Sequence, residues 1–325
     1  MTWQSTLTWK NAQRRAEILQ QIRQFFADRN VCEVETPALS QGTVTDVYLD
    51  ALSCKYDFLA DSPAGHSTEL FLQTSPEFHM KRLLASGYGC IYQIAKAFRH
   101  EESGKNHNPE FTMLEWYRIG FDQFDLMSEV ADLLQVVLGG NKALFTSYQD
   151  IFLKTVSVDP LTASFDEIVE VLNQHEKAAD WLIETNDADL LLQFIFTEII
   201  EPSIGINEPQ FIYDFPIAQA SLAKRSSDDP RVAQRFECYF KGIELVNGFN
   251  ELTDANEQQV RFEEDNAKRA AQGLPVKPID KNFIAALNHG LPQCSGVALG
   301  IDRLVMLAID SDHISGVQSF SIERA

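Results

Sequence analysis

Two segments rich in aromatic and β-branched residues most strongly restrict how this chain can fold. Residues 91–99 and 110–118 flank the polar stretch HEESGKNHNP. Two such segments around a polar loop predict an antiparallel strand pair joined by a long hairpin loop. We therefore expect an antiparallel β-sheet in the fold.

Helices are predicted on both sides of this pair. Residues 11–30 carry apolar side chains at helical spacing, and the following VCEVETPAL alternates like a strand that ends at Pro37. Ser75, Pro76 and Glu77 suit the N-cap, first position and first-turn acid of a second helix. A long helix that leads into a strand thus opens the fold.

The middle of the chain has a different pattern. Roughly residues 121–203 contain amphipathic runs such as FDLMSEVADLLQVVL, which predict a helical insertion. Strand patterns return at 211–215 and 236–246. Asp254 then begins a polar helix, and Gly300 begins the last one.

Composition limits the class of protein. The 325 residues are 45% hydrophobic, which is enough for a full core, and they carry a formal charge of −20. Without an apolar run of about 18 residues or a signal-peptide pattern, we expect a cytoplasmic protein with no membrane segment. The charge disfavours polyanion binding, although Lys268, Arg269 and Lys277 form one small basic candidate patch. The five cysteines are widely spaced and are expected to be reduced.

Common nucleotide and hydrolase motifs are absent from the sequence: it contains no GxxxxGK, strand-GxGxxG-helix or GxSxG pattern. In AFRHE, alternation places Arg99 and Glu101 on one face of a strand. The alternative is an ordinary surface ion pair, and these two residues taken alone favour this alternative over a functional site.

Glu244 and Glu251 lie symmetrically about Asn247-Gly248, the strongest short hairpin signal in the chain. If those two residues form the turn, the carboxylates face each other and require a cation, such as Mg²⁺ bound with phosphate oxygens. The alternative is that one glutamate points to solvent.

The segment GVALGIDRL offers an anion site at a helix start. The backbone amides after Gly300 can face a phosphate, and Arg303 in the first turn would oppose the helix dipole unless an anion binds there. An arginine that simply reaches solvent is the alternative. His79, His100 and His107 show no metal-ligand spacing.

Taken together, these segments resemble the class II aminoacyl-tRNA synthetases. VETPAL resembles the end of motif 1, FRHE…HNPEFTMLEWYR resembles motif 2, and GVALGIDRL resembles motif 3. LFLQTSPEFHMKRLL and IELVNGFNELTDA are similar to the lysyl branch, and closer still to its paralogues that modify a protein. The resemblance implies an α+β catalytic domain over residues 1–325, with an antiparallel sheet flanked by helices, and a homodimer formed through motif 1.

The resemblance also implies ATP and Mg²⁺ as cofactors and assigns roles to individual residues. The residues expected at ATP are Arg99 on the α-phosphate, His100, Glu101, Asn108, Phe111 stacked on adenine, Glu244, Leu245, Gly300, and Arg303 at the γ-phosphate end. Those expected at the amino acid are Ser75, Pro76, Glu77, Tyr117, Glu251 and Ala298. The expected catalytic residues are Arg99, Glu244, Glu251 and Arg303, and the two glutamates would be linked to the metal.

Two departures from lysyl-tRNA synthetases bear on the substrate. Only about ten residues precede the first helix, so no anticodon-binding domain and no anticodon recognition are expected. Ala298 stands where those enzymes tend to carry glycine, which suggests (R)-β-lysine instead of α-lysine. The resemblance thus implies a ligase that activates (R)-β-lysine as an adenylate and transfers it to a lysine ε-amine of elongation factor P. The alternatives are a free-standing lysyl-adenylate or tRNA-charging enzyme, and a non-catalytic regulatory paralogue.

Overall fold

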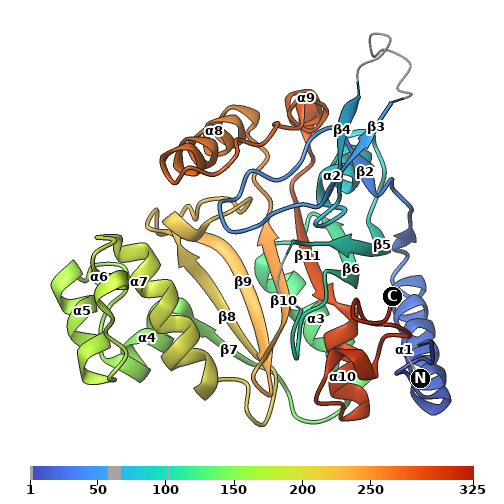
Figure 1. Ribbon diagram of the computed structural model, residues 1–325, viewed down its shortest axis with the longest axis horizontal. Coiled ribbons are helices and arrows are strands. Elements are labelled where there is room, and N and C mark those ends of the chain that lie inside the picture. The colour runs from blue at the N-terminus through green and yellow to red at the C-terminus, as the bar shows by residue number, and fades with distance from the viewer. Residues whose placement is uncertain (1–2, 58–66, 101–102) are drawn as a thin grey trace. The chain divides into compact units, whose positions relative to one another are not determined.

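The structure is a computed structural model that describes residues 3–57, 67–100 and 103–325. The chain forms two compact units, one of Met1–Gly120 with Thr253–Ala325 and one of Phe121–Leu252 (Figure 1). Each unit contains strands and helices, which confirms the α+β class.

The first unit contains the predicted hairpin. Its main strands run in the order β1 (Cys32–Glu33), β5 (Ile91–Phe98), β6 (Glu110–Ile119) and β11 (Cys294–Gly300). The β5–β6 and β6–β11 pairs are antiparallel, and Phe98 lies opposite Glu110 where the long loop begins. Only the edge pair β1–β5 is parallel among these strands.

The strand predicted to end at Pro37 is much shorter than expected. β1 has two residues, and β2 (Leu39–Ser40) pairs instead with β4 (Thr68–Leu72), which also pairs with β3 (Ser53–Tyr56). Pro37 has no N–H to donate to a strand ladder, so the regular pairing ends before it.

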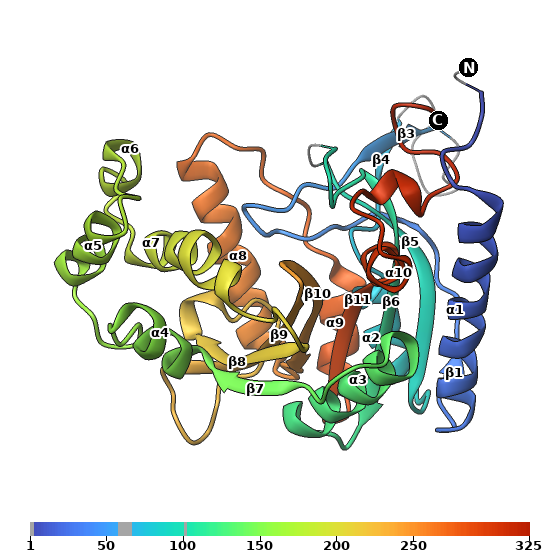
Figure 2. The ribbon, with the colours of Figure 1, turned by 90° about the horizontal axis from the view of Figure 1, so that it is seen from below.

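Helix α1 (Trp9–Ala27) covers one face of the first unit's main sheet (Figure 2). The ring of Phe26 stacks on Tyr92 with 4.3 Å between centroids and meets Trp116 edge-on at 5.3 Å. The predicted helix at 11–30 is confirmed, and its apolar stripe accounts for the packing.

The described part of this unit contains four more α-helices. α2 (Glu77–Ala85) packs on α9 (Lys281–Gly290), which packs on α8 (Ala255–Ala271), and α10 (Ile301–Ile309) packs on β6; a short 3₁₀ helix, η4, spans Ile314–Gly316. α8 and α10 begin after Asp254 and Gly300, as predicted, because the Asp254 carboxylate accepts the Glu257 N–H and glycine leaves the α10 amides uncapped by a side chain.

The basic patch predicted at 268–277 is wrong. Arg269 is 0% exposed and donates hydrogen bonds to the carbonyls of Asp46 and Pro275 and to the carboxylate of Asp50. Lys277 also pairs with Asp50, at 3.0 Å. These cations tie α8 to the loop before β3 and do not form a surface for polyanions.

The second unit holds the middle of the chain. Its strands run β10 (Ile243–Asn250), β9 (Val232–Phe240), β8 (Gln210–Pro216) and β7 (Leu144–Ser147), with β7–β8 parallel and the other pairs antiparallel. The segment 121–203 is largely helical: α3 (Gln123–Leu138), α4 (Tyr148–Val156), α5 (Phe165–Gln174), α6 (Asp180–Ile183), α7 (Ala188–Ile195), a π-helical stretch Phe196–Ile200 and a 3₁₀ turn Glu201–Ser203. A second 3₁₀ turn spans Ile217–Gln219.

An aromatic cluster joins these helices to the second unit's sheet. Tyr148 stacks on Phe152 and Phe196, and Phe215 of β8 and Tyr239 of β9 belong to the same buried group. α3 packs on β9 and β10. The helical segment is therefore packed directly against the strand pair that carries the candidate acids.

Two expectations from composition can be compared with the fold. Among the described helices, none has the length and apolar character needed to cross a lipid bilayer. All five cysteines are free thiols, and two of them, Cys238 and Cys294, are buried.

Candidate active site

One face of the first unit's main sheet carries a row of candidate site residues. Gln93, Glu115 and Ala298 lie opposite one another across β5, β6 and β11, on the face turned away from α1. Ala95, Met113 and Gly300 form the next row on this face.

Glu115 is the centre of a buried polar cluster that the sequence motifs did not single out. It is 2% exposed and accepts hydrogen bonds of 2.6 Å from the hydroxyls of Ser75 and Tyr117. Beside it, Lys81 donates to Glu77 at 2.6 Å, and Lys81 is fully buried. An acid within the aromatic strand EFTMLEWYRI was the available signal, because a charged residue in a buried strand is rare without a partner.

The helix start near this cluster differs from the prediction. α2 begins at Glu77, and Pro76 occupies the N-cap position. The Ser75 hydroxyl accepts the Glu77 N–H at 3.0 Å while donating to Glu115. Ser75 therefore links the helix start to the buried acid and does not act as a simple N-cap.

Burial and, to a smaller extent, the negative charge of Glu77 raise the pKa of Glu115 to about 7, against the opposing effects of Ser75, Tyr117 and Lys81. Near neutral pH this carboxyl group is thus close to its titration midpoint. A cation placed beside it would favour the ionised form. The cluster is suited to bind an ammonium group.

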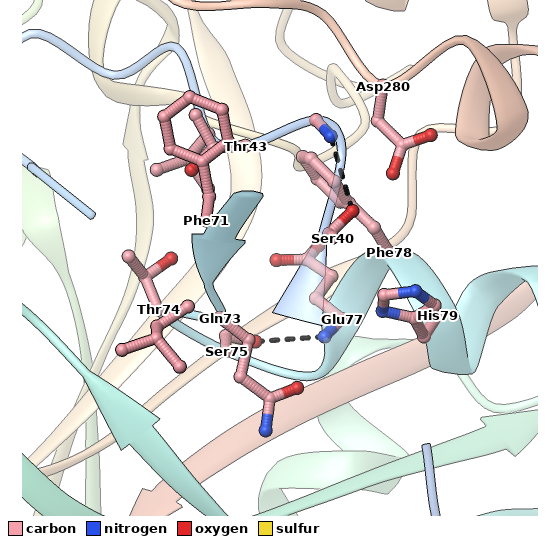
Figure 3. Close-up of a pocket in the computed structure, with 13 residues that line it drawn as sticks. Ser40, Thr43, Phe71, Gln73, Thr74, Ser75, Glu77, Phe78, His79 and Asp280 are labelled. Atoms are coloured by element: carbon pink, nitrogen blue, oxygen red, sulfur yellow. Dashed lines mark hydrogen bonds between the residues drawn. The ribbon is translucent and has the colours of Figure 1, made fainter. Parts of the chain in front are cut away.

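A pocket opens beside Ser75 and Glu77, as Figure 3 shows. Its empty volume is about 400 Å³ including open solvent. His79 and Asp280 lie together on its other side (Figure 3). Burial lowers the pKa of His79, and the nearby charge of Arg82 lowers it further, although Asp280 acts in the opposite direction.

The expected α-phosphate and adenine residues lie together at the end of β5 and the start of β6. The Arg99 guanidinium is 5.2 Å from the ring centroid of Phe111, and its Nε donates to the Thr74 carbonyl at 3.5 Å. Phe111 lies opposite Ala97, on the same face as Glu115. A planar base could stack on an aromatic ring presented this way.

The other candidates from motif 2 and motif 3 differ in their contacts and in their exposure to solvent. Arg303 donates from Nε to the Asn106 carbonyl at 3.3 Å, and its Nη2 is 2.7 Å from His107 Nε2. Asn108 donates to the Glu110 carbonyl and accepts the Ile322 N–H. The His100 side chain is exposed. Glu101 lies outside the described residues.

The hairpin predicted at Asn247-Gly248 is wrong. The turn between β9 and β10 is at Lys241-Gly242, where φ is +51° and +71°, and both Asn247 and Gly248 lie inside β10. A Cβ on Gly248 would lie 2.3 Å from Cζ of Phe236, so this glycine permits close packing and makes no turn.

Glu244 and Glu251 therefore do not face each other across a turn. Glu244 lies opposite Tyr239, and Glu251 bridges Ala223. A bulge between Glu244 and Val246 shifts the alternation by one residue. Because of that shift, Glu244 lies on the same strand face as Asn247. Alternation from Asn247 places Glu251 on this face too, although seven positions separate the two acids.

The same face of β9 carries polar residues that the motif analysis missed. Glu237 pairs with Arg235, accepts from the Tyr239 hydroxyl and accepts from Asn247 at 3.1 Å. The alternation in RFECY was the available signal. Leu245 and Glu251 are buried, at 2% and 1% exposed, while Glu244 is partly exposed.

Within the part of the chain that the structure describes, no group of three or more His, Cys, Asp or Glu side chains is placed to hold a metal ion. Glu244 and Glu251 supply only carboxylate oxygens from one strand face. Mg²⁺ commonly takes one or two carboxylates together with substrate phosphates and water, so either carboxylate could contribute to such a site.

One family model matches nearly the whole chain. The family model described as tRNA synthetases class II (D, K and N) matches residues 2–324. The chain belongs to the class II tRNA synthetases. The resemblance seen in the three motifs is thereby confirmed, and so is the fold class that it implied.

Curated relatives of this class II synthetase cover almost its whole length. Proteins named elongation factor P--(R)-beta-lysine ligase are 52% identical over 324 residues in Pectobacterium carotovorum, 54% over 323 residues in Photorhabdus laumondii and 53% over 327 residues in Salmonella typhi. The matches span 99–100% of this class II synthetase and 98% of each relative.

Proposed function

We propose that this class II synthetase is an ATP-dependent, AMP-forming ligase that activates (R)-β-lysine and transfers it to a lysine ε-amine of elongation factor P. The observation that carries the proposal is the similarity to ligases of that name, at 52–54% identity over nearly the full length. The buried acid at Glu115 supports a substrate that carries an ammonium group.

In this proposal, the amino acid binds over the row that contains Glu115 and Ala298. Glu115, held by Ser75 and Tyr117, would accept one substrate ammonium group, and Glu77, held by Lys81, would face the second. The methyl group of Ala298, opposite Glu115 in register, would disfavour an α-amino group. Pro76 and Glu251 complete the residues that the resemblance assigns to the amino acid.

ATP would bind with its adenine on Phe111, its α-phosphate at Arg99 and its γ-phosphate at Arg303. Asn108 already uses one donor and one acceptor on backbone groups, so a nucleotide contact would use its remaining capacity. The family pattern adds four further residues to the ATP site: His100, Glu101, Leu245 and Gly300. Glu244 and Glu251 would hold Mg²⁺, which neutralises phosphate charge when bound.

The proposed chemistry needs no covalent enzyme intermediate. A carboxylate oxygen of the amino acid attacks the α-phosphorus, and the bond to pyrophosphate breaks. The ε-amine of the acceptor lysine then attacks the activated carbonyl carbon, loses a proton, and AMP leaves. The protein contributes orientation and charge stabilisation at each step.

The proposal also includes expectations about assembly, domain organisation and location. We expect a homodimer because motif 1 resembles the family's subunit interface, and we expect residues 1–325 to act as one catalytic domain in the cytoplasm.

The test is to incubate the protein with ATP, Mg²⁺ and either (R)-β-lysine or α-lysine, together with elongation factor P or lysine tRNA. Intact mass and tRNA charging are then recorded. A mass gain on elongation factor P, larger with (R)-β-lysine and without tRNA charging, is expected. Charging of tRNA alone would establish the synthetase alternative, and absence of pyrophosphate exchange would establish the non-catalytic one.

A further inference from the structure

A buried carboxylate in the first turn of α10 connects separate parts of the first unit. Asp302 is 2% exposed. Its Oδ2 accepts the Thr112 N–H at 2.8 Å and the Gln318 amide at 2.9 Å, and its Oδ1 lies 2.8 Å from Nη1 of Arg15 on α1. One carboxylate thus joins α1, β6, α10 and the segment after it.

Two of its partners also contact the start of β6 directly. Arg15 donates from Nη2 to the Thr112 hydroxyl at 2.9 Å, and Gln318 donates to the Glu110 carbonyl at 3.2 Å. The Arg15 side chain is 17% exposed, so the ion pair is largely shielded from solvent. The network therefore closes on the first three residues of the strand.

Two residues of this network are sequence neighbours of proposed ATP-binding residues. Thr112 directly follows Phe111, and Asp302 directly precedes Arg303. The hydrogen bond from the Thr112 N–H to the Asp302 carboxylate therefore links the backbone next to Phe111 to the side chain next to Arg303.

A contribution to folding stability alone does not explain the buried ion pair between Asp302 and Arg15 well. Replacing a buried ion pair with apolar residues is often neutral or stabilising. The free energy needed to remove both charges from water offsets most of the attraction between them. A buried pair that crosses between a helix and two ATP-site elements is better explained by the geometry it imposes.

We infer that Asp302 and Arg15 are positioning residues for ATP: they hold Phe111 and Arg303 at the separation that the nucleotide requires. This inference rests on the proposed function, because it takes the ATP roles of those two residues from it. Asp302 and Arg15 act through their neighbours and do not touch the substrate.

The test compares Arg15→Met, Arg15→Lys and Asp302→Asn with the unmodified protein. Arg14→Met is the matched control, because Arg14 is the preceding residue of α1 and pairs only with Glu17 at the surface in the described contacts. ATP affinity is measured by calorimetry, and KM for ATP and for the amino acid by pyrophosphate exchange. Melting temperature is recorded for each variant.

Arg15→Met is expected to weaken ATP binding about tenfold, which corresponds to about 1.4 kcal/mol, with KM for the amino acid changed less than about twofold. Arg15→Lys should recover part of the ATP affinity, and Arg14→Met should change neither value. The double variant Arg15→Met/Asp302→Asn should lose less than the sum of the single losses, because the two residues form one pair.

Equal increases in both KM values, or unchanged ATP affinity in folded Arg15→Met and Arg15→Lys, would overturn the inference. If the unmodified protein binds ATP without exchanging pyrophosphate, only the proposed reaction fails, and the calorimetric comparison still decides the inference. If it binds no ATP, both fail.

Discussion

At the scale of single residues, the ionisation of the Glu115 carboxyl group depends on the charge of the group that binds beside it. Its pKa in the unliganded protein is raised to about 7, mainly by burial. An ammonium group that binds next to this carboxyl group favours its ionised form. Below pH 7, binding of a lysine-type amino acid must therefore release a proton from Glu115.

We expect the affinity for (R)-β-lysine to increase as pH rises from 6 to 7, by up to about tenfold per unit, and to level off by pH 8. Calorimetry in two buffers with different ionisation heats measures the protons released. The expected release is close to one at pH 6 and small at pH 8. Release that does not vary over this range would contradict the assignment of Glu115.

Glu115→Gln separates charge from shape at this position. The amide keeps the size of the side chain and has no titrating proton, so proton release should disappear. Loss of a charge-assisted hydrogen bond should weaken amino-acid binding at pH 8 by about tenfold to a hundredfold. Glu110→Gln on the same strand is the matched control, because Glu110 is half-exposed and pairs with Lys96.

Substitution of Arg99 tests its proposed role at the α-phosphate of ATP. Removing a charge-stabilising donor at a reacting centre typically costs about 3–4 kcal/mol. Arg99→Ala should therefore reduce pyrophosphate exchange by at least about a hundredfold, with an unchanged melting temperature because the side chain is only partly buried. Adenylate formation that survives within a few-fold would remove Arg99 from the site.

At the scale of elements, the β9–β10 hairpin shows how packing can override a local turn signal. Lys241-Gly242 form the turn, and Gly248 lies against the Phe236 ring within the strand pair. The bulge after Glu244 then brings two acids at an odd spacing to one face. The bulge thus sets which face the acids share, and the glycine permits the close packing of the two strands.

Gly248→Ala should destabilise the protein by about 1–3 kcal/mol, because the added methyl group overlaps the Phe236 ring. Urea denaturation measures the loss. Gly89→Ala is the control, since a Cβ there meets nothing within 4 Å and should leave the midpoint unchanged. If the overlap is the cause, adding Phe236→Leu to Gly248→Ala should recover part of the lost stability, and no recovery would point to another cause.

At the scale of the whole molecule, the same buried acid links function to stability. The pKa of Glu115 is 4.5 in its ordinary state and about 7 in the fold. A raised carboxyl pKa means that this group's contribution to stability is full below pH 4.5 and is lost as pH rises through 7. At pH 8 the ionised group should cost up to about 3 kcal/mol of folding free energy before a substrate binds.

Glu115→Gln should therefore raise the urea midpoint of the unliganded protein at pH 8 and change it much less at pH 5. Saturating (R)-β-lysine should narrow the difference at pH 8, because the substrate binds the ionised glutamate more tightly than the amide and so stabilises the unmodified protein more. A variant that is less stable than the unmodified protein at pH 8 would show that the Ser75 and Tyr117 hydrogen bonds outweigh the burial of charge.

Local signals predicted much of the fold. The β5–β6 hairpin, α1 and the start of α10 follow from periodicity, aromatic content and a glycine, which are properties of short segments. Predictions failed where distant segments intervene. Arg269 looked like a surface cation, but its partner Asp50 lies 219 residues away and covers it within the fold.

By itself, the sequence determined the family, the order of the motifs and most of the helices and strands, because each depends on residue types at fixed short spacings. Only the tertiary structure decided the environment of Glu115 and the network at Asp302. Desolvation and pairing depend on neighbours such as Ser75 and Arg15, which lie 40 and 287 positions from Glu115 and Asp302 in the chain. A carboxyl group's pKa and its partners are set by what the completed fold packs around it.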